Sequence, residues 1–309
     1  MIRLTSDLPV PEALRGAIVA LGNFDGFHAG HQAVVGEAIR WAKAEGRPAI
    51  VATFDPHPVA IFAPDAAPFR LTTLDQRQEL FAQAGADAML VFNFTRAFAA
   101  TSAHDWVHAV LGHTIGAAGV VTGTDFTFGK GREGDIATLA TLGAEIGMKA
   151  RAVAPVEDTQ GVISSSRIRD ALRDRDPATA TRLLTRPFAI RSTVQHGDKL
   201  GRTIGFPTAN LALGDYLRPA YGIYAVTGHL PDGRVLKGAA NIGVRPHFDP
   251  PKELLEPHFF DFSEDLYGQE IEVAFHAFLR GEAKFESMDA LIEQIGADCD
   301  LARKVLEEV

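Results

Sequence analysis

The first half of the chain alternates short apolar runs with segments in which hydrophobic residues recur at helical spacing. Five runs are short, apolar and bounded by glycine, proline or polar residues, as strands are: 17–22, 49–54, 88–94, 119–123 and 149–155. Apolar positions after the first run line one side of a helix that ends near Gly46: Val34, Val35, Ala38, Ile39 and Ala42. Alternating strands and helices predict an α/β fold with a parallel sheet, in which ligands bind at the carboxyl ends of the strands.

After about residue 184 the pattern changes to an alternation of apolar and polar positions, which is typical of antiparallel strands. The alternation occurs in four runs: 188–195, 222–230, 234–241 and 270–279. Between two of them, Pro231, Asp232 and Gly233 predict a hairpin, because proline presets φ and glycine accepts a positive φ. We therefore expect an α/β domain over residues 1–184 and an antiparallel β-barrel or sandwich over residues 185–309. A terminal helix with Ser287 as its N-cap closes the chain.

Composition narrows the class of protein. A length of 309 residues fits about two domains, and 46% hydrophobic with 22% charged residues excludes a disordered chain. The net charge of −9 gives no basic field, so we expect no nucleic-acid partner. Charged residues interrupt the N-terminus, and histidines, glycines and threonines break the longest stretch without charged residues, 106–124, which predicts a cytoplasmic protein with no membrane partner. Cys299, the single cysteine, is expected to be buried on the last helix, and the oligomeric state is left open.

Residues 22–31 follow the first predicted strand and place two histidines where a helix begins. His28 and His31 are three residues apart, so they share a helix face and can donate together to one polyphosphate beside the positive end of the helix dipole. A zinc site would need further ligands, and histidines that only stabilise the loop are the structural alternative. The loop residues expected to bring backbone close to the phosphates are Gly22, Phe24, Gly26 and Gly30.

A second polar segment, residues 163–169, enters a helix after the last strand of this half. Ser164, Ser165 and Ser166 supply hydroxyls, and Arg169 supplies a guanidinium group. Taken alone, such serines are more often N-caps and such arginines solvated charges. Together with the histidines they could hold the two ends of a triphosphate, so that its α-phosphorus is aligned for attack.

Two further loops follow predicted strands and are candidate walls of a substrate site. The first contains Asp55 and His57, after the second strand. The second, after the fourth strand, contains Asp125, Phe128 and Arg132. Their prolines and glycines alone would indicate ordinary turns, but their position at strand carboxyl ends favours a role in binding.

The second half carries its own polar motif within residues 196–210. Gly201 and Gly205 indicate a pliable loop for phosphates, and Pro207 holds the preceding residue extended, so that a strand is expected to begin at Thr208. In a strand Thr208 and Asn210 point to one face, where their oxygens can bind a hard cation such as Mg²⁺. A polar strand edge after a turn is the structural alternative.

These motifs, in this order, resemble those of bacterial bifunctional FAD synthetases, which are also riboflavin kinases. The matching segments are GxFDGxHxGH, TFDPHP, GxDFxFG…RxGD and ISSxRIR in the first half, and GFPTAN and LExHxxDF in the second. The resemblance implies a Rossmann-like nucleotidyltransferase domain that transfers AMP from ATP to FMN with release of pyrophosphate. It also implies a β-barrel riboflavin kinase domain that makes FMN from riboflavin and ATP, with Mg²⁺.

The resemblance also implies roles for single residues. His28, His31 and Arg169 match catalytic positions, and Ser165 and Ser166 match positions that handle ATP. Asp125 matches the substrate loop of the adenylyltransferase.

Glu256 takes the catalytic position of the kinase, where a carboxylate orients the ribityl 5′-hydroxyl and accepts its proton. Two alternatives stay open: a nucleotidyltransferase for another phosphorylated small molecule with an accessory barrel, and a flavin-binding regulator without catalysis.

Overall fold

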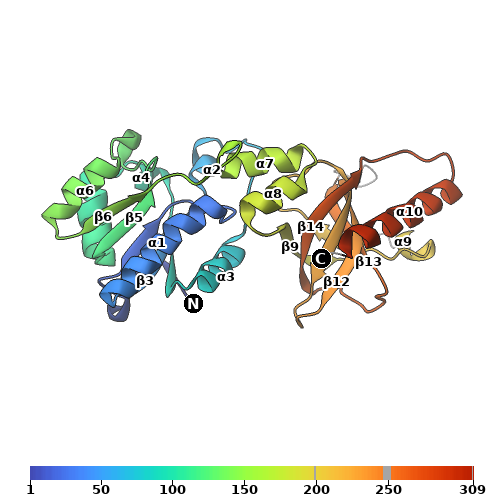
Figure 1. Cartoon of the computed structure of the whole chain (residues 1–309), viewed down its shortest axis with the longest axis horizontal. Helices are drawn as coiled ribbons and strands as arrows, with labels where there is room; N and C mark the ends of the chain where they lie inside the picture. Colours follow the sequence, from blue (N-terminus) through green and yellow to red (C-terminus); the bar gives the residue numbers. More distant parts are fainter. Residues whose placement is uncertain (198–199, 246–251, 308) are drawn as a thin grey trace. The chain divides into compact units, whose positions relative to one another are not determined.

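The computed structural model describes residues 1–197, 200–245, 252–307 and 309, which form two compact units (Figure 1). The first unit comprises residues 1–67 and 72–164, and the second comprises residues 68–71 and 165–309. Helices α7 (Ser165–Arg173) and α8 (Pro177–Leu184) therefore pack with the second unit. One contact of α7 with this unit is the hydrogen bond from Ala220 N to Leu172 O, at 3.0 Å. The domain boundary after residue 184 stays a prediction.

The first unit contains a six-stranded parallel sheet with the order β1-β4-β3-β2-β5-β6. All five predicted strands are confirmed, and β1 is an additional edge strand that is short and largely exposed. The strands are β1 (Ile2–Thr5), β2 (Ile18–Leu21), β3 (Ala49–Asp55), β4 (Ala88–Asn93), β5 (Gly119–Gly123) and β6 (Lys149–Val153). A small antiparallel pair, β7 (Glu157–Asp158) and β8 (Gly161–Val162), follows them.

Helices cover both faces of this sheet (Figure 1). Along β2, Ile18 and Ala20 pack into the core that includes Phe81, whereas Val19 and Leu21 pack into the core that includes Trp106. This alternation is the expected consequence of a strand buried on both faces. The helical segments of this unit are η1 (Glu12–Leu14), α1 (Ala29–Glu45), α2 (Pro58–Phe62), α3 (Leu74–Ala84), α4 (Arg96–Ala99), α5 (Ala103–Asp105), the π-helix η2 (Trp106–Ile115), η3 (Lys130–Arg132) and α6 (Ile136–Glu145).

The predicted helix between the first two strands is confirmed as α1. It ends where Gly46 adopts the left-handed conformation, with φ of 64°, which an L-residue with a side chain rarely adopts. Val34, Val35, Ala38 and Ala42 are buried on its inner side, as the spacing predicts.

The second unit contains a closed antiparallel barrel, which confirms the barrel alternative to a sandwich. The Pro231–Gly233 hairpin is also confirmed: Gly233 has a φ of 89° and donates its N–H to Leu230 O at 3.0 Å. The strands, in their order around the barrel, are β10 (Asn210–Ala212), β13 (Lys252–Phe259), β12 (Val235–Arg245), β11 (Gly222–His229), β14 (Glu270–Arg280) and β9 (Phe188–Gln195).

Two details of the barrel's polar motif differ from the prediction. The strand begins at Asn210 rather than Thr208, because the paired ladder of β9 and β10 starts at Asn210. A helical turn, α9 (Leu200–Thr203), stands where a glycine-rich loop was expected. Residues 198–199 of the same motif lie outside the described part of the chain.

The terminal helix α10 (Met288–Leu306) packs on the barrel (Figure 1). Ser287 is its N-cap, as predicted: its side chain accepts a hydrogen bond from Ala290 N at 3.1 Å. Small residues on the strands, Ala225 and Ala239, contact the buried face of this helix. Cys299 lies in that contact as expected, and burial raises the pKa of its thiol to about 11.

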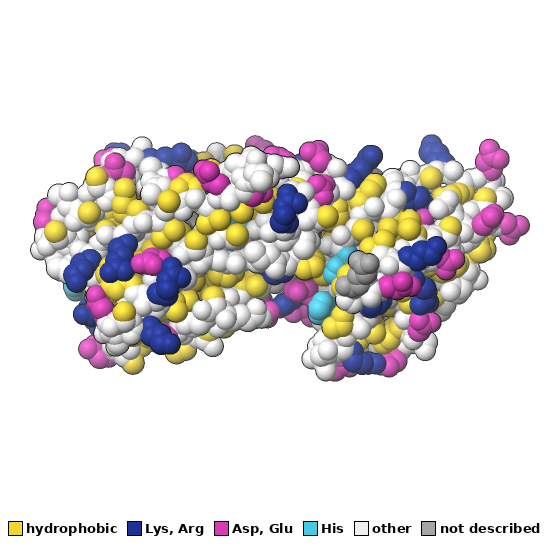
Figure 2. Space-filling model, in the orientation of Figure 1, with side chains coloured by type: hydrophobic (Ala, Val, Ile, Leu, Met, Phe, Trp, Pro, Cys, Tyr) yellow, Lys and Arg dark blue, Asp and Glu magenta, His cyan; other side chains and the backbone are white. Residues whose placement is uncertain are grey.

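The surface carries charges of both signs. On the face drawn in Figure 2, basic and acidic side chains are interspersed over the molecule. In the ranges that the structure describes, no helix is both long and apolar enough for a membrane crossing.

Candidate functional site

Three of the predicted loops meet at one edge of the parallel sheet. Strand β2 lies between β3 and β5, and all three run in the same direction. The loops that follow them begin at Gly22, after Asp55 and after Gly123, so they emerge side by side. Because chain winding reverses on the two sides of β2, this edge is the topological switch point at which α/β sheets bind ligands.

The loop after β2 is held in one conformation by a buried carboxylate. Asp25 is only 3% exposed, and its Oδ1 accepts hydrogen bonds from Thr72 N at 3.0 Å and from Thr72 Oγ1 at 3.2 Å. The same hydroxyl accepts a hydrogen bond from Gly26 N at 2.9 Å. Gly26 has a φ of 85°, which suits glycine. The path of the loop into α1 is therefore fixed before any ligand binds.

The two histidines lie at the start of α1 with their rings stacked. The ring centroids are 3.6 Å apart and the planes differ by 22°. His28 is the N-cap rather than a helical residue, so the pair arises from the capping geometry and not from two positions on one helix face. His28 Nδ1 accepts a hydrogen bond from His31 N at 3.4 Å. In the neutral ring this leaves the proton on Nε2. Donation from the pair to a phosphate stays a prediction.

Neighbouring residues shape this pair. A Cβ atom on Gly30 would lie 3.1 Å from Cε1 of His28, so glycine makes room for the ring. The Phe24 ring contacts His31 edge-on at 5.3 Å, and a Cβ atom on Gly22 would lie 3.0 Å from the Phe24 ring. Gly22, Phe24 and Gly30 thus pack around the histidines, and their contact with phosphate stays a prediction.

Arg77 on α3 is a site residue that sequence reasoning missed. Its side chain is 3% exposed and joins the loop after β2 to the carboxyl end of β3. The guanidinium group donates to Asn23 O at 3.2 Å and to Thr53 Oγ1 at 2.8 Å, and it lies 3.9 Å from the Asp55 carboxylate. The sequence signals the start of α3 through the capping box of Thr73 and Gln76. It does not signal that this helix places an arginine under two strand ends.

The predicted flavin-binding residues occupy the two neighbouring loops. Asp55 ends β3, and His57 caps α2 by accepting a hydrogen bond from Val59 N at 3.2 Å. Asp125 and Arg132 are exposed. Phe128 is buried instead, with its ring 5.0 Å from that of Trp106, so it supports the loop from the core. Contact of any of these residues with flavin stays a prediction.

The serine and arginine segment spans the division between the two units. Ser164 ends the first unit, and α7 begins at Ser165 in the second. Within the second unit, Arg169 Nε donates to Phe69 O at 2.8 Å, and the guanidinium group lies 5.3 Å from the centre of the Phe69 ring. Ser166 is exposed on the same helix. That this segment binds the same triphosphate as the histidines stays a prediction.

In the barrel, three polar side chains form a row across neighbouring strands. Leu211 pairs with Leu255, which places Asn210 opposite Glu256, and β12 places Asn241 opposite Glu256 on its other side. Directly opposite residues share a face of the sheet. The next residues along the strands are fully buried, namely Leu211, Leu255 and Ile242. The polar row therefore lies on the outer face of the barrel.

Thr208 extends this row of polar side chains, although it precedes strand β10. Ala209 N donates to Pro257 O at 3.0 Å, so the chain already runs beside β13, and Thr208 falls opposite His258. Two glycines bring the preceding segment against these side chains. A Cβ atom on Gly197 would lie 2.4 Å from Asn210 Nδ2, and one on Gly201 would lie 3.5 Å from Thr208 Oγ1. Gly205, between Gly201 and Thr208, has a φ of 87°.

The donor atoms of this row suit a hard cation. Threonine hydroxyl, asparagine carbonyl and carboxylate oxygens are the ligands that Mg²⁺ takes in proteins. Asn241 Oδ1 is buried and makes no hydrogen bond with any described residue, which leaves an oxygen in need of a partner. The stretch that begins at Asn241 is also part of the resemblance, but the sequence gives Asn241 no role in the site, because its place beside Glu256 depends on strand register.

Comparison with known proteins assigns each half to an enzyme family. The FAD synthetase family model matches residues 10–167, and the riboflavin kinase family model matches residues 184–306. A solved structure described as a macrolide-efflux protein from Streptococcus pneumoniae aligns over 98% of this chain and 99% of its own, with a TM-score of 0.87 and 31% identity. The fold of this chain is thus shared over nearly its whole length.

Relatives of known name match over nearly the whole chain. The bifunctional riboflavin kinase/FMN adenylyltransferase of Escherichia coli K12 is 39% identical over 289 residues, which is 94% of this chain and 92% of the relative. The protein of the same name from Bacillus subtilis is 37% identical over 297 residues, again 94% of this chain and 92% of the relative. This chain therefore belongs to the family of bifunctional riboflavin kinase/FMN adenylyltransferases.

Proposed function

We propose that this protein phosphorylates riboflavin to FMN in the barrel unit and adenylylates FMN to FAD in the parallel-sheet unit. ATP is the co-substrate of both reactions. The observation that carries the proposal is that two separate sets of polar groups, one around His28 and His31 and one around Glu256, lie within the residues matched by the two family models. Riboflavin, FMN and ATP are its small-molecule partners, and we place it in the cytoplasm.

In the adenylylation, an oxygen of the FMN phosphate attacks the α-phosphorus of ATP, and the bond to pyrophosphate breaks. His28 and His31 donate to the phosphates and stabilise the charge that develops on them. Asp25 and Arg77 hold the loop that carries the pair. We assign the leaving pyrophosphate to Ser164, Ser165, Ser166 and Arg169, with Gly22, Phe24 and Gly30 shaping the phosphate pocket. Flavin contacts are assigned to Asp55, His57, Asp125, Phe128 and Arg132.

In the kinase reaction, the ribityl 5′-hydroxyl of riboflavin attacks the γ-phosphorus of ATP. Glu256 orients this hydroxyl and accepts its proton as the new oxygen–phosphorus bond forms and ADP leaves. Thr208, Asn210 and Asn241 offer oxygen ligands for Mg²⁺, which neutralises phosphate charge when it is bound. The backbone around Gly201 and Gly205 is assigned to the phosphates of ATP.

A time course with purified protein tests the proposal. The protein is incubated with riboflavin, ATP and magnesium chloride, and the flavins are separated by chromatography. FMN should appear first and FAD later, and a chelator should suppress both. Flavin binding without any product would instead indicate a regulator. FAD formed only from added FMN would indicate a single-activity nucleotidyltransferase.

A further inference from the structure

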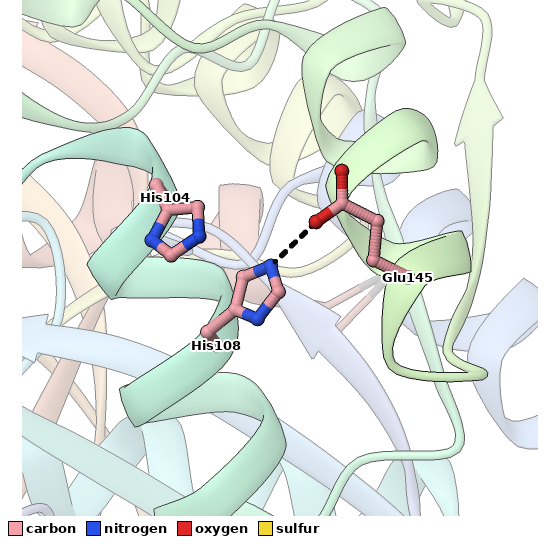
Figure 3. Close-up of side chains that lie close together, drawn as sticks. All are labelled: His104, His108 and Glu145. Atoms are coloured by element: carbon pink, nitrogen blue, oxygen red, sulfur yellow. Dashed lines mark ion pairs between the residues drawn. The ribbon is translucent and has the colours of Figure 1, made fainter.

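A second group of potential ligands lies on helices of the first unit and contains none of the residues assigned above. His104 on α5 and His108 on η2 are four residues apart on one continuous helical segment, and Glu145 ends α6 (Figure 3). The two imidazole rings are stacked, with centroids 4.1 Å apart and an angle of 11° between their planes. His108 Nε2 lies 3.1 Å from a Glu145 carboxylate oxygen.

The three side chains converge closely enough to bind one ion. One ligand atom from each lies within 4.8 Å of the other two. A zinc ion bound at about 2.0–2.1 Å keeps the atoms of a tetrahedral set roughly 3.3 Å apart. His108 Nε2 is buried and makes no hydrogen bond with any described residue, because its 3.1 Å contact with the Glu145 carboxylate lies outside hydrogen-bond geometry. Small side-chain rotations would thus bring the three ligand atoms to the distances that zinc requires.

The surroundings of His104 suit a ligand. Its Nδ1 lies 3.3 Å from Asp105 Oδ1, which leaves Nε2 as the atom for a metal. Metal-binding histidines usually donate their other ring N–H to a carboxylate in this way.

The helices that carry the group are held in place by the core. Trp106 and Leu111 of η2 and Leu139 of α6 are buried together in one cluster. Gly112 allows the two elements to approach, since a Cβ atom there would lie 2.8 Å from Ile146 Cδ1. The site is therefore largely built before an ion arrives, which lowers the entropic cost of binding.

We propose that His104, His108 and Glu145 bind a divalent transition-metal ion of the zinc class. Two imidazoles and one carboxylate favour such an ion over Mg²⁺, which prefers oxygen ligands. The side chains of His104 and Glu145 are 61% and 52% exposed, so water can complete the coordination. The bound ion joins η2 to α6 and stabilises the first unit against unfolding.

Zinc titration of the full chain tests the proposal. The protein is stripped with a chelator and titrated with zinc chloride in excess Mg²⁺, with calorimetry for affinity and the visible spectrum of added Co²⁺ for coordination. We expect one equivalent to bind at the cluster, with a rise of roughly 2–5 °C in melting temperature near saturation. His108→Gln and Glu145→Gln should each weaken this binding at least about tenfold.

A histidine outside the cluster supplies the matched control. His113→Gln lies on the same helix and should leave affinity unchanged. Unchanged zinc affinity in the double variant His104→Gln/His108→Gln, with a wild-type circular dichroism spectrum, would overturn the proposal, as would wild-type protein that binds no zinc. Because the experiment measures metal binding, either negative result would overturn the metal site without bearing on the proposed flavin reactions.

Discussion

The two units build their candidate sites from different levels of structure. In the parallel-sheet unit, His28 and His31 meet through one helix cap, within a few residues of sequence. In the barrel, Asn210, Glu256 and Asn241 come from three strands and meet only through register. A slip of one residue would turn Glu256 toward the barrel interior. The first site thus depends on contacts between residues close in the sequence. The second site forms only when the strands of the barrel have paired.

The largest expected effect is a loss of kinase activity in the barrel that leaves adenylylation in the other unit unchanged. Glu256→Gln removes the proton acceptor with little change in shape, so riboflavin phosphorylation should fall by about 10²–10⁴-fold. Adenylylation of added FMN should continue at the wild-type rate. Initial rates of FMN and FAD formation measure both, and Glu270→Gln, at an exposed position on β14, is the control. Equal loss of both activities would show that the sites are not independent.

The converse variant tests the local site. His28→Ala removes a phosphate donor and the N-cap of α1, and FAD formation should fall by about 10²–10³-fold. FMN should then accumulate from riboflavin. Chromatography of the reaction mixture follows both flavins, with His113→Gln as the control. Undiminished FAD formation would contradict a catalytic role for the pair.

Arg77 tests whether the local site depends on its buried support. Arg77→Met removes the charged donor to Asn23 O and Thr53 Oγ1, at a cost of about 1.5–3 kcal/mol per hydrogen bond, and leaves only the hydrogen bond of 2.7 Å from Thr53 Oγ1 to Asn23 O between these groups. Displacement of the loop should lower adenylylation by up to about 10²-fold, while riboflavin phosphorylation is kept. Thermal unfolding and the two rates provide the measurements. A loss of stability with a wild-type FAD rate would reduce Arg77 to a purely structural role.

The smallest expected loss of activity concerns Gly197, in the segment that lies against Asn210. In Gly197→Ala the new methyl group would collide with the Asn210 amide, and kinase kcat/KM should fall about tenfold. Gly296→Ala on α10 meets no atom within 4 Å and is the matched control. If Gly197→Ala retained full kinase activity, the position of Asn210 would not matter for the reaction.

Elements with a strong local pattern could be predicted from the sequence. The five predicted strands β2 to β6, α1 with its glycine stop at Gly46, and α10 with its cap at Ser287 each carry their own signal. Strand β1 does not, because it is short, largely exposed and specified by its pairing with β4. The predicted strand start at Thr208 was wrong for a related reason: the ladder begins where a partner strand is in register.

The candidate sites divide along the same line. The histidine loop could be found because its glycines and histidines are contiguous, although the role of His28 as the cap needed coordinates. Arg77 and Asn241 could not be found, since each becomes a site residue only through partners far away in the sequence. Long-range packing, rather than composition or spacing, decides which polar residues join a site.

Mixing the two variants tests the central claim of two independent sites most directly. His28→Ala and Glu256→Gln are supplied with riboflavin, ATP and magnesium chloride, each alone and then together, and FAD is measured by chromatography. Neither variant alone should make appreciable FAD, whereas the mixture should, because FMN released by the first is adenylylated by the second. A mixture that makes no more FAD than the separate variants, while added FMN is still converted by Glu256→Gln, would contradict exchange of free FMN between independent sites.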